Sequence, residues 1–295
     1  MEKEKYDFIK ISETLEFLFR RLFSYPYTND LFGGENMQWK MGVKYLVLFG
    51  LCFLGGRFLA SERVELTSGE KRGELAILID DFGYCGEGTA EMLDLPIPFT
   101  AAVMPFSKCT EADAEAVRQA GKEIFIHMPM ESLTGKREWV GDKGVFRNMT
   151  EEEIKARVEE AFSILPDAAG LNNHMGSAIM EDERSLSAVM DVLKEKNVMF
   201  VDSMTTAKSL GRTMAGQKGV TFLGRDVFLD STDSVEEVKK NLRKAAEVAL
   251  EKGYALAIGH VGPEGGMVTV QAIKELIPEL ESAGITFVTV TELVK

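Results

Sequence analysis

Three histidines and two adjacent aspartates are the residues of this sequence that could do chemistry together. His127 in EIFIH, His174 in AAGLNNH and His260 in ALAIGH each follow a strand-like stretch or a short turn after one. Asp80 and Asp81 end a further stretch of this kind, LAILIDD. A lone histidine there is more often a core or rim residue, and a lone aspartate often caps a helix. Two adjacent buried carboxylates, however, need a compensating cation, and a divalent metal is the simplest one.

A zinc site would use these residue types directly. Zinc binds imidazole nitrogens and carboxylate oxygens and, in catalytic sites, keeps a position for water. One aspartate and two histidines meet that need, and a water held there becomes a usable nucleophile near neutral pH. The remaining carboxylate can serve as base and the remaining histidine as acid. These residue types therefore favour metal-dependent hydrolysis.

Strand and helix patterns alternate from Gly73 onward, and these elements must position the five groups. Apolar, β-branched runs predict strands at residues 75–79, 100–104, 123–126, 198–201, 227–229, 255–258 and 286–290. Amphipathic patterns predict helices at residues 112–120, 151–165, 183–196, 235–252 and 270–283. Roughly six to eight such units in about 225 residues favour a (β/α) barrel or near-barrel, with a doubly wound open sheet as the alternative. A parallel barrel brings the carboxyl ends of its strands to one face, where the five groups would converge.

The first 40 residues differ from this pattern. They contain a short helical pattern followed by a loop-like segment, SYPYTNDLFGGEN, and we expect a poorly ordered extension. Met37 and Met41 would each make a natural start for the segment that follows. We therefore interpret residues 1–36 as an over-long gene prediction.

Residues 41–60 contain an apolar run, residues 45–56, that two lysines precede. The run is short for a membrane span and fits a secretory signal peptide or an uncleaved membrane anchor. A buried apolar helix in the cytoplasm is the alternative. We expect an exported protein of the periplasm, cell envelope or medium, with residues 45–56 as a candidate membrane tether. A polar linker at 61–72 and a catalytic domain at 73–295 would follow.

The net negative charge of the chain argues against some classes of binding partner. The net charge is −13, and residues 61–295 alone carry 26 basic and 40 acidic side chains. This field repels phosphates, so the sequence argues against nucleic acid and against anionic membrane surfaces as partners. Solubility is the ordinary explanation of such a charge.

The three cysteines contain no CxxC pair, which excludes a structural zinc knot. Cys85 and Cys109 could form a disulfide in an oxidising compartment. Two unpaired, partly buried thiols are the preferred expectation.

Seven segments together resemble the successive motifs of the divergent polysaccharide deacetylase family. They are LAILIDDFG, FTAAVMPF, IFIHMPME, GLNNHMGSAIMEDERSL, FVDSMTTAKS, GRDVFLD and AIGHVGPEGG, in family order over about residues 74–295. The family is related to the NodB-type carbohydrate esterases, which have a deformed (β/α) barrel and remove N- or O-linked acetyl groups with a divalent metal, typically zinc. The resemblance implies this α/β fold, a zinc-dependent deacetylase, and an acetylated polysaccharide or oligosaccharide as substrate.

The resemblance also implies a role for each of the five groups. Asp80 matches the first aspartate of the paired-Asp motif, the general base, and Asp81 matches the second, a metal ligand. His127 in HMPME matches the first metal histidine, and His174 in NNHMGS matches the other histidine of the divergent family. His260 in IGH resembles the late histidine that acts as general acid.

Further polar residues lie in the same motifs. We expect Asn172 and Asn173 to hydrogen-bond the ligand shell or the substrate, or else to form a plain turn. The remaining family-like positions would support the site or contact the substrate: Glu131 in HMPME, Asp202 and Ser203 in FVDS, and Arg225, Asp226 and Asp230 in GRDVFLD.

Two features after His127 leave alternatives open. The wider superfamily places a second metal histidine four residues later, where this chain has Glu131, so His174 is the candidate replacement. This departure weakens the inference of substrate and activity from the better understood relatives. The alternative is a catalytically silent metal-binding module of the envelope that recognises a glycan or protein partner. Hydrolysis of a non-carbohydrate amide is a further one. Trp139, in the loop expected after His127, could stack on a sugar ring or anchor the loop by packing.

Overall fold

The computed structural model describes residues 72–262 and 265–294. The extension expected at residues 1–40, the signal or anchor at 41–60, its apolar run at 45–56 and nearly all of the linker at 61–72 lie outside the described residues. Within the described part of the chain, no helix is both long enough and apolar enough to cross a bilayer.

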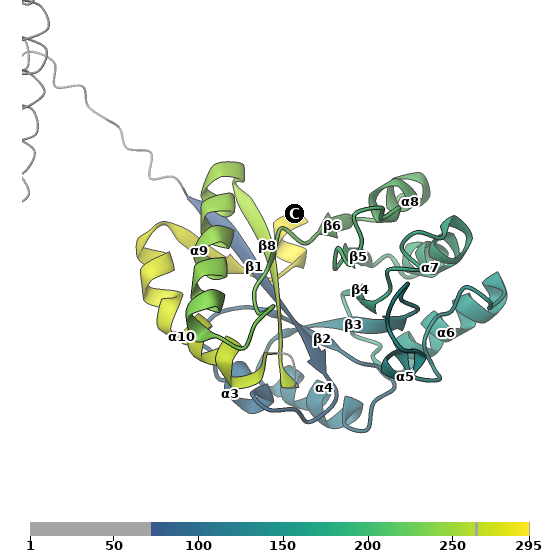
Figure 1. The fold of residues 1–295 in the computed structure, drawn as a ribbon, viewed down its shortest axis with the longest axis horizontal. Helices are drawn as coiled ribbons and strands as arrows, with labels where there is room; N and C mark the ends of the chain where they lie inside the picture. Colours follow the sequence, from purple (N-terminus) through teal and green to yellow (C-terminus); the bar gives the residue numbers. More distant parts are fainter. Residues whose placement is uncertain (1–71, 263–264, 295) are drawn as a thin grey trace, which may run out of the picture. The chain divides into compact units, whose positions relative to one another are not determined.

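Strands that are all parallel form one curled sheet with helices on its outer side (Figure 1). The strands are β1 (Gly73–Phe82), β2 (Thr100–Val103), β3 (Glu123–Met130), β4 (Gly170–Met175), β5 (Met199–Asp202), β6 (Phe222–Gly224), β7 (Val227–Phe228), β8 (Tyr254–His260) and β9 (Ile285–Val288). Their order is β6-β5-β4-β3-β2-β1-β8-β7, and β9 pairs with the first half of β1. The ladder begins at β6 and ends at β7, so this is the deformed, open barrel expected from the sequence. The strands β4 and β6 were not expected.

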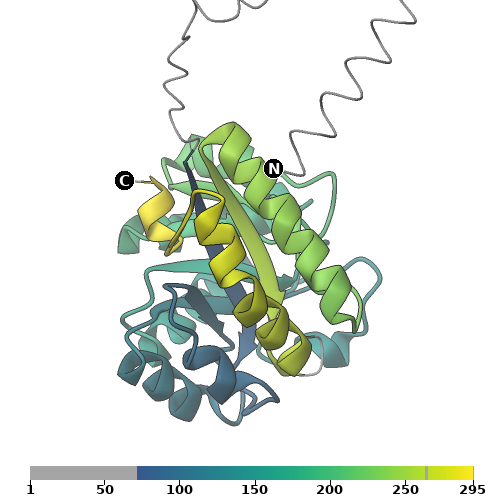
Figure 2. The same ribbon diagram turned by 90° about the vertical axis from the view of Figure 1, so that its left-hand side faces the viewer.

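The helices follow the strands in alternation and cover the convex face of the sheet (Figures 1 and 2). They are α3 (Thr89–Leu93), α4 (Thr110–Gln119), α5 (Arg137–Val140), α6 (Glu151–Ile164), α7 (Glu183–Lys196), α8 (Gly211–Lys218), α9 (Val235–Lys252) and α10 (Gly266–Ser282). The C-terminal 3-10 helix η3 (Thr291–Val294) instead packs Leu293 against the apolar residues inside the curl. Polar side chains begin several of them as the sequence predicts. Thr150 and Glu153 form a capping box at α6, and Asp182 and Ser234 cap α7 and α9.

Strand alternation divides the core into two layers. On β1, Leu75 and Ile77 pack against the helices, whereas Ala76 and Leu78 belong to a smaller cluster inside the curl. Phe125 of β3 and Ile258 of β8 belong to that inner cluster as well. Because side chains alternate along a strand, the next inward positions after these apolar residues fall at Asp80, His127 and His260. The same alternation that fills the interior with apolar side chains thus carries polar groups to its carboxyl edge.

Cys85 and Cys109 form a disulfide with a Cα–Cα distance of 5.6 Å. The expectation of free thiols was therefore wrong. The bond ties the loop after β1 to the start of α4, and Asp113 of α4 fastens the same loop by accepting hydrogen bonds from the backbone of Gly83 and Cys85. Two independent links therefore fix the loop that directly follows Asp81.

Candidate metal centre

A backbone irregularity at the end of β1 brings both aspartates into one site. Regular alternation would send Asp80 and Asp81 to opposite faces of the sheet. Instead, the β1–β2 register shifts between Ile79 and Phe82, and Asp81 has a φ of 67°, in the left-handed region that aspartate tolerates better than most residues. As a result, Asp80 Oδ1 lies 3.4 Å from His127 Nδ1 and Asp81 Oδ1 lies 3.5 Å from His127 Nε2.

Three potential ligand atoms form a triangle at this edge. His174 Nδ1 lies 3.1 Å from His127 Nε2 and 3.3 Å from Asp81 Oδ1, and the third side is the 3.5 Å between Asp81 and His127. A tetrahedral zinc site with bonds of about 2.0–2.1 Å has ligand–ligand edges of about 3.3–3.4 Å. Asp81 Oδ1 is also buried and accepts no well-aligned hydrogen bond from any described residue, since its 3.3 Å contact is with His174 Nδ1, itself a corner of the triangle. The donor set and the unsatisfied oxygen both fit a divalent metal.

Asn172 connects Asp80 to His127, one of the candidate metal ligands. This fully buried amide donates from Nδ2 to Asp80 Oδ1 at 2.8 Å and to Ser203 Oγ at 3.1 Å. Its Oδ1 therefore faces His127 Nδ1, 2.9 Å away, and accepts the proton on that nitrogen. The arrangement leaves the lone pair of His127 on Nε2, the atom at the corner of the triangle.

Ser203 and Asn173 fix the position of Asn172 through a chain of hydrogen bonds. Ser203 Oγ donates to the carbonyl of Asn173 at 2.9 Å, and the backbone N–H of Ser203 donates to Asn173 Oδ1 at 3.0 Å. Asn173 Nδ2 donates to the carbonyl of Met175 at 2.7 Å, across the turn that follows His174. Neither residue reaches the triangle, so they hold the loops rather than the metal position.

Burial sets the protonation of the buried groups. It raises the pKa of Asp80 to about 7, against the opposing influence of His260. Burial and, second to it, the neighbouring His174 together lower the pKa of His127 to about 3. Burial also acts to raise the pKa of Asp81, but the nearby His174 and His127 outweigh it and hold that pKa at about 2. The triangle thus offers an ionised carboxylate and a neutral imidazole, the forms that bind metal.

His260 lies on the other side of Asp80, with Nε2 3.9 Å from Asp80 Oδ2. Its Nδ1 donates to Asp230 Oδ1 at 2.8 Å, while its backbone N–H and the hydroxyl of Thr269 donate to Asp230 Oδ2 at 2.7 and 2.6 Å. Burial acts to lower the pKa of His260, but the hydrogen bond and charge of Asp230 raise it to about 9. His260 is therefore a protonated imidazolium that presents Nε2–H toward Asp80.

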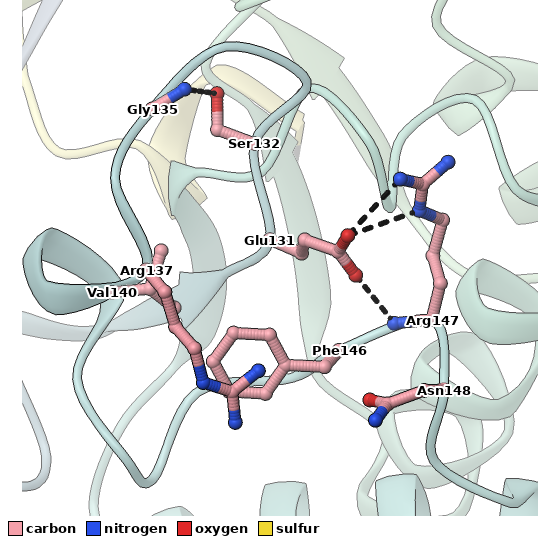
Figure 3. A pocket seen from close by; sticks show the side chains of 8 residues that line it. All are labelled: Glu131, Ser132, Gly135, Arg137, Val140, Phe146, Arg147 and Asn148. Carbon is pink, nitrogen blue, oxygen red and sulfur yellow. Dashed lines mark hydrogen bonds and ion pairs between the residues drawn. The ribbon is translucent and has the colours of Figure 1, made fainter.

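Three residues expected near the metal use their polar atoms elsewhere. Glu131 binds the backbone and guanidinium of Arg147 and lines a separate pocket (Figure 3). Asp202 accepts from the backbone N–H of Met204 at 2.7 Å and shapes the turn after β5. Asp226 accepts a hydrogen bond from the backbone N–H of Leu256 and forms an ion pair with Lys252 of α9. Leu256 lies on β8, four residues before His260.

Arg225 has an intermediate position. Its guanidinium donates to the carbonyls of Ser203 and Met204 and stacks over Phe228 at 4.7 Å, close enough to Asp80 to feel its charge. Sequence reasoning missed Thr269, which completes the shell of Asp230, and Asp113, which fastens the loop after Asp81. Both lie on helices, where nothing in the sequence pattern distinguishes them from ordinary polar helix residues.

Comparison with known proteins agrees with this architecture. Residues 77–294 match the divergent polysaccharide deacetylase family. An uncharacterized protein of Haemophilus influenzae is 32% identical over 213 residues, which cover 72% of this chain and 75% of that protein. The uncharacterized protein YibQ of Escherichia coli is 32% identical over 216 residues, covering 73% of this chain and 67% of YibQ.

A solved structure extends the likeness of fold. The crystal structure of an uncharacterized protein from Agrobacterium tumefaciens has a TM-score of 0.69 at 20% identity, covering 77% of this chain and 91% of that one. The match to the family spans nearly all of the described residues, including every group of the metal centre. The chain therefore belongs to the divergent polysaccharide deacetylase family.

Proposed function

We propose that this protein is a metal-dependent hydrolase that removes acetyl groups from an acetylated glycan. The observation that carries the proposal is the triangle of Asp81 Oδ1, His127 Nε2 and His174 Nδ1 beside the pair of Asp80 and His260. Metal ligands, a carboxylate base and an imidazolium acid are the three parts that hydrolysis of an amide or ester by a metal-held water requires.

The three atoms of the triangle would hold the metal, with zinc as the best match to two imidazoles and one carboxylate. When bound, such a metal polarises the scissile carbonyl and lowers the pKa of a water it holds. Asn172 fixes the tautomer of His127 that makes this binding effective.

Asp80 is the proton acceptor in this proposal. Its Oδ1 receives the hydrogen bond of Asn172, which fixes the carboxylate in orientation. Its Oδ2 faces His260 across a 3.9 Å gap. A carboxylate held in this way can take the proton from an attacking water without first reorienting.

His260 is the proton donor. The hydrogen bond from Nδ1 to Asp230 leaves the second proton of the imidazolium on Nε2, on the same side as Asp80. That proton passes to the leaving amine or alcohol as the carbon–nitrogen or carbon–oxygen bond breaks. Thr269 and the backbone of His260 saturate the other oxygen of Asp230, so the ring has one orientation.

Exposed apolar side chains around the site support a glycan as substrate. Tyr84, Leu133, Met204 and Met267 are four of the six exposed large hydrophobic residues among the described part of the chain. They follow β1, β3, β5 and β8, so they lie at the edge of the sheet that carries the metal centre. Apolar surface at this rim suits an acetyl methyl group and the faces of sugar rings.

The disulfide supports export as part of the proposal. Disulfides persist in the periplasm, at the cell surface and in the medium and are rare in the cytosol. We therefore propose that the protein works outside the cytoplasm, on a glycan of the envelope. Rapid alkylation of Cys85 and Cys109 as free thiols in intact source cells would contradict export.

The test is acetate release from tetra-N-acetylchitotetraose and from a generic acetyl ester by the zinc-loaded protein. Asp80→Asn and His260→Gln should each lower kcat by about 10²- to 10⁴-fold while zinc content stays constant. Asp226→Asn, which removes a paired carboxylate at the opposite edge, is the matched control and should keep wild-type activity. Zinc-loaded wild-type protein that releases no acetate from either substrate would reject the enzyme and favour the silent binding module.

A further inference from the structure

A pocket opens beside the candidate metal centre, between the end of β3 and the loop that leads to α6. It has a volume of about 610 Å³, within the range of small-ligand sites. Figure 3 shows its lining: Glu131, Ser132, Gly135, Arg137, Val140, Phe146, Arg147 and Asn148. None of these residues belongs to the catalytic groups of the proposed function.

The pocket adjoins the turn that carries His174. Ser132 Oγ lies 3.0 Å from Ser177 Oγ, and the backbone N–H of the following residue also donates to Ser177 Oγ. Gly135 lies so close to Met175 that a Cβ at this position would overlap the methionine methyl group. Because Met175 directly follows His174, the pocket lies beside the segment that carries a candidate metal ligand.

Arg137 is the pocket's unpaired cation. Its guanidinium lies flat over the ring of Phe146, 3.7 Å from the centroid (Figure 3). In the described part of the chain, Arg137 and Arg212 are the arginines whose guanidinium makes neither a hydrogen bond nor an ion pair. Arg147, by contrast, is held by Glu131 at 3.0 Å. Stacking fixes the plane of the Arg137 group and leaves its N–H donors for a ligand.

The local charge favours an anion there. Residues 132–149 contain four basic and two acidic side chains, although the whole chain has a net charge of −13. The guanidinium of Arg137, which forms no ion pair, matches a ligand with a single negative charge. The nearby Glu131, which is paired with Arg147, would repel a dianion such as phosphate. Trp139, on the short helix α5, is 58% exposed, which argues against a packed anchor. Lys136 lies over one face of its ring, 5.6 Å from the centroid, and the exposed surface suits a sugar ring.

We infer that this pocket is a subsite for a carboxylate on the sugar next to the acetylated one, so that the substrate is an acidic glycan. The inference rests on the proposed function for the placement of the acetyl group. Arg137 would bind the carboxylate through two parallel N–H donors, the geometry that guanidinium and carboxylate share.

Binding of a matched pair of ligands tests this subsite. The acid is the disaccharide of glucuronic acid and N-acetylglucosamine, and the neutral ligand is its methyl ester. Titration calorimetry should show the acid binding roughly tenfold more tightly than the ester, the difference expected for one charge-assisted hydrogen-bonded pair. Arg137→Gln should abolish that difference, and Arg137→Lys should restore part of it.

Arg212→Gln is the matched control, because Arg212 is also exposed and stacks on a phenylalanine, but on α8. It should keep the tenfold preference. Equal affinity for acid and ester, no binding of either, or an unchanged preference in Arg137→Gln would overturn the subsite. A preference that depends on Arg137 in a protein without deacetylase activity would keep the subsite and reject the proposed function, whereas activity without the preference would do the reverse.

Discussion

The two edges of the sheet differ in whether their polar groups have hydrogen-bond partners within the protein. At the amino edge, Thr100 Oγ1 donates to Glu123 at 2.6 Å and accepts from the backbone of Val290, and the hydroxyl of Thr291 donates to the same glutamate. At the carboxyl edge, Asp81 Oδ1 is buried without a well-aligned hydrogen-bond donor among the described residues, and the polar atoms beside it are the two other candidate ligands. A polar cluster that is complete stabilises the fold, whereas an incomplete one is costly unless a ligand completes it. The difference supports the proposal that the carboxyl edge is the functional one.

Two aspartates on either side of β7 repeat this contrast within five residues. Asp226 accepts from the backbone of Leu256 and pairs with Lys252 near the amino edge. Asp230 holds the imidazole of His260 at the carboxyl edge. The same residue type therefore supports the fold at one end of a short strand and orients a reactive group at the other.

Removing a ligand from the triangle should have the largest effect. His127→Ala and His174→Ala should each lower zinc affinity by more than about 10³-fold, well beyond the 10- to 100-fold loss typical of residues behind the ligands. Competition with a chromophoric chelator measures this. His260→Ala should bind zinc as wild type does, and a His174→Ala protein with unchanged affinity would show that His174 is not a ligand.

Asn172→Ala should have the next largest effect. It removes the hydrogen bond that holds the His127 tautomer and the one that orients Asp80, so zinc affinity should fall roughly 10- to 100-fold. Ser203→Ala, which removes only a neighbour of Asn172, should cost less in the same competition assay. An Asn172→Ala affinity equal to that of wild type would mean that the metal position does not depend on this amide.

The pH profile should separate the acid from the ligands. Since the pKa of His260 is raised to about 9, kcat/KM should fall as pH rises through that value and the imidazolium loses its proton. Asp230→Asn removes the raising influence and should move this alkaline limb about one to two units toward lower pH. An alkaline limb that stays in place in Asp230→Asn would assign the limb to another group.

The smallest effect should come from the amino edge. Thr291→Val keeps the shape of the side chain but removes its hydrogen bond to Glu123, so the free energy of unfolding should fall by about 1 kcal/mol. Urea denaturation measures this loss, and zinc affinity should not change. A change in zinc affinity would show that the two edges are coupled and would contradict a purely structural role for the amino edge.

The sequence was sufficient to predict which groups would converge, because strand alternation and parallel pairing follow from local patterns. His127 and His260 continue the inward series of β3 and β8, which apolar residues begin. The strand β4 was not predicted, because its middle consists of Asn172, Asn173 and His174 and lacks apolar alternation. The polar residues of the site therefore removed the apolar pattern from which the strand could have been predicted.

Other features depend on contacts that no local pattern encodes. The left-handed conformation of Asp81 follows from a register shift between two strands. The different partners of Asp226 and Asp230 depend on which end of β8 each one meets. The disulfide joins cysteines 24 positions apart, a spacing that carries no signal of its own.

The position of zinc in a crystal, located by anomalous scattering above and below its absorption edge, tests the central claim most directly. We predict one peak about 2.0–2.2 Å from Asp81 Oδ1, His127 Nε2 and His174 Nδ1 together. Zinc bound through other side chains, or no peak in protein saturated with zinc, would contradict it.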